Sequence, residues 1–185
     1  MEYGREILDK YHDKKINSFN KIVAVERNIR NVMVDGIPLK GKIDKMEFDG
    51  HKVNVVDYKT GNPDNAKAKL KNPESDPPYG GDYWRQAVFY KLLIDNNDQG
   101  KYQVMSTEFD FVEPNAKKEI SSILVPISKD DTDAVREQIQ MVWEKIQARD
   151  FYTGCGKQDC HWCNFVKTNK LQVGFVEEEQ EVLFD

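Results

Sequence analysis

Two short stretches combine acidic and basic residues at spacings suited to chemistry on a phosphate. Asp57-Tyr58-Lys59 ends a segment with strand character, so the first and third residues share one face. Asp44, in Gly41-Lys42-Ile43-Asp44, precedes the turn signal Asp49-Gly50, and pairing across that turn places Asp44 within one rung of Asp57. Adjacent carboxylates without thiolate or imidazole favour Mg²⁺ or Mn²⁺, with Lys59 available to stabilise phosphate charge. The alternative is two strand-end acids and a surface lysine.

A second set of candidates lies on the following helix and in the loop before it. Gln86 and Tyr90 are four residues apart in a segment with helical periodicity and therefore share one face. Polar surface plus a core tyrosine explains them equally. Four basic side chains could contact a nucleic-acid backbone, or could simply be solvated: Lys67, Lys69, Lys71 and Arg85.

The elements that must position these residues alternate between helices and strands. Apolar periodicity predicts an N-terminal helix, three strands in meander order, a long loop, a second helix, a β-hairpin and a third helix. Their ranges are 2–17, 20–34, 37–48, 51–60, 61–81, 82–95, 101–113 with 117–127, and 128 onward; from 151 the chain is expected to be irregular. This order predicts a mixed sheet flanked by helices, an α/β (α+β) fold.

Composition sets the class of protein. The 185 residues predict one compact domain, 1–150, followed by a cysteine-containing segment with an acidic tail, 151–185. The net charge is −5, but five of the 32 acids lie in the last nine residues, so the remainder is neutral and charge alone names no partner. With no signal-peptide pattern, no apolar run of about 20 residues and only three clustered cysteines, we expect a cytoplasmic protein without a membrane contact.

Taken together, the motifs resemble those of RecB-like nucleases. Gly41-Lys42-Ile43-Asp44, Val55-Val56-Asp57-Tyr58-Lys59-Thr60-Gly61 and Gln86-Ala87-Val88-Phe89-Tyr90 are similar to the three core motifs of these enzymes, over roughly residues 2–150. The family belongs to the PD-(D/E)XK superfamily and is often fused to superfamily 1 helicases. Its α-β-β-β-α-β core, a restriction-endonuclease-like fold, matches the element order above.

The resemblance implies metal-dependent hydrolysis of DNA, exonucleolytic and linked to repair or recombination. Asp44, Asp57 and the main-chain carbonyl of Tyr58 would hold Mg²⁺ or Mn²⁺. Lys59 would be the catalytic lysine, and Gln86 and Tyr90 would contact DNA or support the site. A helicase motor in the same polypeptide or complex would be the partner. The competing hypothesis is a catalytically inactive RecB-like module that binds DNA or acts as a scaffold for a helicase.

Two departures from the family pattern matter. The upstream His or Glu ligand is absent, since His12 lacks the usual flanking pattern, so we expect a piece of a larger protein with weakened metal affinity. The cysteines occur as Cys155-x₄-Cys160-His161-Trp162-Cys163, whereas relatives with an iron–sulfur cluster use the opposite order of gaps and a fourth cysteine. Packed reduced thiols, a cluster completed by an upstream cysteine, and a zinc site all stay open. Absorbance near 400 nm would identify the cluster.

Overall fold

A computed structural model describes residues 2–74, 78–150 and 158–168 of the chain. By their internal contacts the residues form two compact units, Met1–Trp143 and Glu144–Asp185. The first unit contains every residue of the three predicted motifs. Within the described residues, no helix is both long enough and apolar enough to cross a membrane.

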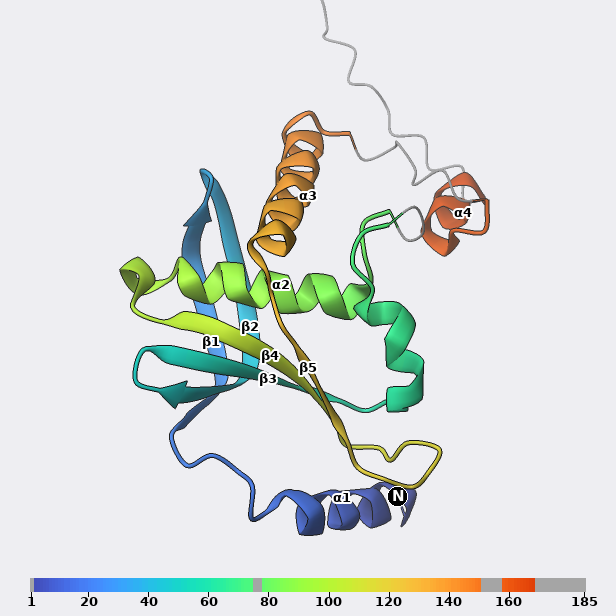
Figure 1. Ribbon diagram of the computed structural model, residues 1–185. Coiled ribbons are helices and arrows are strands. Elements are labelled where there is room, and N and C mark those ends of the chain that lie inside the picture. The colour runs from blue at the N-terminus through green and yellow to red at the C-terminus, as the bar shows by residue number, and fades with distance from the viewer. Residues whose placement is uncertain (1, 75–77, 151–157, 169–185) are drawn as a thin grey trace, which may run out of the picture. The chain divides into compact units, whose positions relative to one another are not determined.

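A five-stranded mixed sheet, in the spatial order β1-β2-β3-β4-β5, is the centre of the first unit (Figure 1). The β1–β2, β2–β3 and β4–β5 pairs are antiparallel, and the β3–β4 pair is parallel. The predicted meander and the predicted hairpin are therefore confirmed, with strands shorter than expected at several ends. The strands are β1 (Val23–Val34), β2 (Ile37–Asp49), β3 (Lys52–Lys59), β4 (Gln103–Phe111) and β5 (Ser122–Val125).

Local sequence explains why the meander begins as a tight hairpin. Asp35 and Gly36 both have positive φ, 51° and 80°, which is the conformation of a type I′ turn. This turn matches the right-handed twist of the flanking strands, so Val34 pairs directly with Ile37. The Asp-Gly signal in the sequence is thus the physical cause of the β1–β2 register.

Helices cover both faces of the sheet. Phe109 and Asp110 are consecutive on β4 and therefore point to opposite faces; Phe109 packs with Ala87 of α2, whereas Asp110 bonds to Tyr11 of α1. Figure 1 shows these two helices on opposite sides of the strands. The helices are α1 (Glu2–Lys15), α2 (Asp82–Asp95), α3 (Lys129–Gln147) and α4 (His161–Thr168), with two 3₁₀ helices, η1 (Pro63–Leu70) and η2 (Asp98–Gly100).

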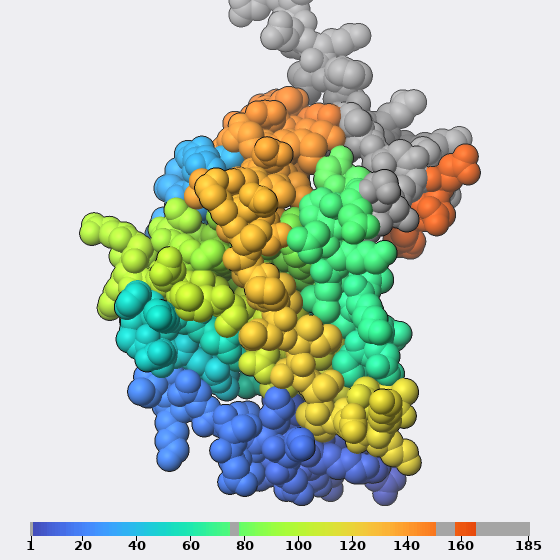
Figure 2. Space-filling model, viewed as in Figure 1, coloured from blue at the N-terminus to red at the C-terminus, as the bar shows by residue number. Residues whose placement is uncertain are grey.

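The segment 61–81 is expected from its sequence to be a loop with one helical turn around Ala66–Leu70. The structure confirms this turn as part of a longer 3₁₀ helix, η1 (Pro63–Leu70). Asn62 caps it by accepting the backbone N–H of Asp64, and Pro63 occupies the first helical position. Figure 2 shows η1 at the surface beside β5 and the β4–β5 loop. A second correction concerns the region after residue 151, expected to be irregular throughout, because α4 forms at His161–Thr168.

The main apolar core lies between α2 and the strands. It includes Ile43, Val55 and Leu93, all fully buried. The strand β2 approaches α2 closely at Gly41, where an added Cβ would lie 2.4 Å from Leu93 Cδ1. Any larger residue at this position would therefore displace Leu93. Gly41 precedes the motif aspartate Asp44 by three residues.

Asp131 connects the start of α3 by hydrogen bonds to α2 and to the segment before it. Its Oδ2 accepts the backbone N–H and the hydroxyl of Ser128, at 2.8 and 2.6 Å. Its Oδ1 accepts the indole N–H of Trp84 at 2.9 Å and the amide of Asn72 at 2.7 Å. Burial raises the pKa of Asp131, but the hydrogen bonds from Ser128 and Trp84 outweigh it, so the pKa lies below its ordinary value of 3.8.

We expect Asp131→Ala to lower the free energy of unfolding by about 3 kcal/mol, because it removes a helix cap and leaves a buried indole N–H unpaired. Since folding lowers the pKa of Asp131, this stabilisation is complete above pH 3.8 and is lost as the pH falls through the folded pKa. Urea unfolding should therefore show a larger difference in the free energy of unfolding between the wild type and Asp131→Ala at pH 7 than at pH 3. Asp133→Ala, which removes only an exposed pair with Lys129, is the control. Equal urea midpoints of the wild type and Asp131→Ala at pH 7 would contradict the assignment.

Candidate functional site

The end of β3 brings Asp57 and Lys59 together on the face of the sheet that α2 covers. Asp57 Oδ2 lies 2.6 Å from Lys59 Nζ, and the two side chains are 4% and 17% exposed. This carboxylate oxygen is buried and has no hydrogen bond of good geometry among the described residues, although the charge of Lys59 lies beside it. A buried carboxylate oxygen in this state can accept a further cation.

Two side chains of α2 hold the other oxygen of Asp57. Tyr90 donates its hydroxyl to Asp57 Oδ1 at 2.6 Å, and Gln86 donates its amide to the same oxygen at 3.1 Å. Gln86 also donates to the Tyr90 hydroxyl at 2.7 Å and accepts from Lys59 Nζ at 2.8 Å. Burial, and then the hydrogen bond to Asp57, raise the pKa of Tyr90, so this hydroxyl stays protonated and keeps donating.

Asp44 completes the arrangement from the neighbouring strand. The ladder between β2 and β3 ends at the pair Lys45–Val56, one residue before Asp44 and Asp57. Beyond this pair, Asp44 Oδ2 accepts the backbone N–H of Tyr58 at 3.1 Å. The N–H and C=O of one strand residue point to the same side, and those of its neighbour to the other. Because the Lys59 carbonyl accepts from Val112 beside β4, the Tyr58 carbonyl faces Asp44.

A backbone irregularity in β1 lies opposite Asp44. Glu26, between the pairs Val25–Lys45 and Arg27–Ile43, has a φ of 52°. Non-glycine residues rarely adopt this left-handed conformation, and within a strand it redirects the chain. The first strand is therefore distorted at the level where β2 separates from β3 and where Asp44 turns to the Tyr58 backbone.

Two aromatic residues that the sequence analysis did not single out surround the lysine. Lys59 Nζ lies 4.7 Å from the ring centroid of Tyr83 and 5.2 Å from that of Phe109, within the range of cation–π attraction. The two rings are stacked, with centroids 4.9 Å apart. Tyr83 precedes Gln86 by three residues and so shares its helix face, a signal available in the sequence; Phe109 comes from β4, and nothing local marked it.

From the opposite face, α1 packs behind the same stretch of β3. The ring of Tyr11 meets that of Tyr58 edge-on, with centroids 6.4 Å apart. The Tyr11 hydroxyl donates to buried Asp110 at 2.5 Å, and Lys15 lies 2.9 Å from the other oxygen of that carboxylate. Burial and the Asp110 carboxylate raise the pKa of Tyr11, which therefore remains a donor. This packing supports the backbone of Tyr58 from behind.

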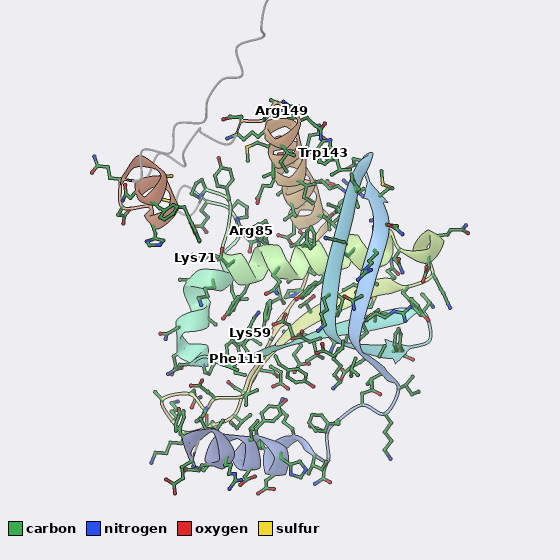
Figure 3. All side chains as sticks on the ribbon, turned by 180° about the vertical axis from the view of Figure 1, so that it is seen from behind. Lys59, Lys71, Arg85, Phe111, Trp143 and Arg149 are labelled. Carbon is green, nitrogen blue, oxygen red and sulfur yellow. The ribbon has the colours of Figure 1, made fainter. Side chains whose placement is uncertain are left out.

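The residues predicted to contact a nucleic-acid backbone lie in two different environments. Lys69 Nζ is 4.8 Å from the Tyr83 ring, so it shares an aromatic partner with Lys59. Lys67 and Lys71 are exposed on and after η1. Arg85 pairs with Asp82 at 2.7 Å and donates to the Tyr79 carbonyl at 3.1 Å. Figure 3 labels Lys59, Lys71 and Arg85 around the N-terminal end of α2.

The oxygen donors fit a hard divalent cation. Among the described residues, no group of three or more His, Cys, Asp or Glu side chains is placed to hold a metal ion. Mg²⁺, however, usually binds through one or two carboxylates and keeps several waters. Asp57 Oδ2, the Asp44 carboxylate and the Tyr58 carbonyl form such a partial set.

The remaining candidates lie elsewhere in the chain. His12 is exposed on α1, on the face of the sheet opposite α2, 3.5 Å from Asp13. In the second unit, Cys160 and Cys163 are half-buried at the start of α4, and Cys155 lies outside the described residues. The three interpretations of the cysteines stay predictions.

The fold is a restriction-endonuclease-like α+β domain, with a mixed sheet between α1 and α2. Two acids and a lysine lie where the pairing of β2 with β3 ends. The family model of the PD-(D/E)XK nuclease superfamily matches residues 2–168, and the chain belongs to that superfamily. No curated protein matches the chain.

Two solved structures are similar to this fold. A crystal structure of a "Putative exonuclease" from Eubacterium rectale has a TM-score of 0.52 at 11% identity, covering 87% of this chain and 58% of that one. The crystal structure of SSO0001 has a TM-score of 0.46 at 14% identity, covering 86% of this chain and 63% of that one. The chain thus spans about three fifths of each of these structures.

Proposed function

We propose that this domain is a RecB-like deoxyribonuclease that hydrolyses phosphodiester bonds of linear DNA with Mg²⁺ or Mn²⁺. The observation that carries the proposal is the buried, incompletely bonded Asp57 oxygen with Asp44 beside it and Lys59 at 2.6 Å. Membership of the nuclease superfamily supports the same chemistry.

Each residue of the site has a distinct role in this proposal. Asp44, Asp57 and the Tyr58 carbonyl would hold the divalent cation. When bound, the cation polarises a phosphate and lowers the pKa of water. Lys59 would stabilise the charge that develops on the phosphate, held in place by Gln86 and the rings of Tyr83 and Phe109. Tyr90 fixes the orientation of Asp57 through its short hydrogen bond.

The wider setting is also a proposal. The domain would be an exonuclease working with a helicase motor, in the same polypeptide or complex, in DNA repair or recombination. Lys67, Lys69, Lys71 and Arg85 would contact the DNA backbone near the site, and the cytoplasm would be its location.

The test uses end-labelled linear DNA, single- and double-stranded, incubated with the chain and Mg²⁺ or Mn²⁺. We expect shortened products that disappear when EDTA removes the cation. A circular single strand of equal length distinguishes the mode of cleavage, since only an endonuclease cuts it. DNA binding without cleavage under all conditions would overturn the catalytic proposal in favour of an inactive DNA-binding or scaffolding module.

A further inference from the structure

The hairpin of β1 and β2 carries a groove that overlaps the predicted motifs only at Gly41 and Lys42. Its volume is about 690 Å³, and its polar lining consists of amides and cations: Asn28, Arg30, Asn31, Lys40 and Lys42. The other lining residues are apolar or glycine, and none is acidic. In Figure 3 the hairpin runs as a long pair of strands past α2.

A β-bulge shapes this groove. Ile29 pairs with Gly41 and Val32 with Leu39, so Arg30 and Asn31 together oppose the single residue Lys40. Asn31 has a φ of 58°, the left-handed conformation that such bulges use to redirect a side chain. Arg30 on the edge strand β1 and Lys40 on β2 therefore lie at one level of the hairpin, and both are exposed to solvent.

The groove and the candidate active site share the strand β2. Lys42 precedes Asp44 by two residues and Lys40 precedes it by four, which corresponds to about 7 and 13 Å along β2. At the duplex spacing of about 3.4 Å per nucleotide, Lys40 lies roughly four nucleotide steps from the site. Glu26 pairs with Lys42 and so compensates the charge of that groove lysine, whereas Asp35 lies 3.6 Å from Arg136. Arg30 and Lys40 carry the remaining positive charge of the lining.

We infer that this groove binds the sugar–phosphate backbone of the nucleic-acid strand that extends from the active site. The inference rests on the proposed nuclease function, which it extends by a second contact. Cations with amides and no acid complement phosphate charge, and the lack of an aromatic residue in the lining means that bases have no stacking platform. The contact is therefore independent of base sequence and acts on affinity rather than on chemistry.

The test compares Arg30→Gln/Lys40→Gln with Lys21→Gln/Lys52→Gln. Both double variants lose two positive charges, but Lys21 and Lys52 are exposed near the other end of the sheet. Fluorescence anisotropy in EDTA measures the Kd of a labelled 20-nucleotide strand and of a 3-nucleotide strand at several salt concentrations. We expect the groove variant to bind the 20-mer about tenfold more weakly at low salt, with a salt slope reduced by about 1.4, and the 3-mer less than twofold more weakly.

Three outcomes would overturn the inference. The groove variant and the control variant could bind the 20-mer equally, or the 3-mer could lose as much affinity as the 20-mer. A polyglutamate peptide could also displace the 20-mer as effectively as unlabelled DNA of equal charge, which would make the groove a site for acidic protein segments. The binding assay contains no metal and measures no cleavage, so its failure is distinguishable from failure of the nuclease proposal.

Discussion

Asp57→Asn is expected to abolish DNA cleavage, lowering kcat by about a thousandfold, or about 4 kcal/mol of transition-state stabilisation. Asparagine keeps the shape of the side chain and an oxygen for the Tyr90 hydroxyl, but it removes the negative charge beside Asp44. The divalent cation therefore loses its buried ligand. Calorimetric titration with Mn²⁺ should show the corresponding loss of affinity.

The matched control is Asp95→Asn at the other end of α2. Asp95 also forms a lysine pair, with Lys91 at 2.7 Å, and accepts the backbone N–H of Val104. We expect this variant to cleave DNA at the wild-type rate, because it lies outside the site. Full activity of Asp57→Asn, with circular dichroism showing that both variants are folded, would refute the assigned site.

Lys59→Met is expected to separate chemistry from metal binding. The substitution removes the only cation within reach of Asp57 Oδ2 among the described contacts, so kcat should fall by about a hundredfold to a thousandfold. Affinity for Mn²⁺ should be unchanged or higher, because the ammonium no longer repels the metal ion. The variant should also gain more thermal stability from Mn²⁺ than the wild type, since the cation compensates a buried carboxylate.

Lys91→Met provides the comparison for this second prediction. Lys91 is half-buried on α2 and pairs with Asp95. Its substitution therefore removes a lysine–aspartate pair like that of Lys59 and Asp57, but away from the site. Measurements of kcat, KM and Mn²⁺ affinity on both variants test whether Lys59→Met lowers kcat without lowering metal affinity. If Lys59→Met lost metal affinity in proportion to kcat, the lysine would be a structural partner of Asp57 and no more.

Several features of the fold followed from short-range rules. The turn at Asp35-Gly36 needs two positive φ values, which these residue types tolerate, and the resulting hairpin formed where predicted. Across the next turn, Lys45 pairs with Val56 in the register that the turn predicted. Asp44, one residue further, bonds to the backbone of Tyr58, next to Asp57. The four-residue spacing of Gln86 and Tyr90 put both on one helix face, where they hydrogen-bond to each other.

Other features depended on contacts between residues far apart in the chain. Tyr11 and Asp110 are 99 residues apart, and nothing around either one indicates the other. The approach of Phe109 to Lys59 follows from the parallel pairing of β3 with β4, which local patterns do not specify. The helix α4 formed in a segment that was expected to be irregular, and η1 extends beyond the single turn expected around Ala66–Leu70.

By itself the sequence determined the candidate reactive groups, because the residue types and spacing of Asp44, Asp57 and Lys59 single them out. Strand alternation puts the last two on one face. Only the tertiary structure decided their chemical state. Packing of α2 onto the sheet buries Asp57, saturates one of its oxygens with Tyr90 and Gln86, and leaves the other beside Lys59. The reason is that burial and hydrogen-bond saturation are properties of surfaces brought together from distant segments, whereas periodicity and turn chemistry act within a few residues.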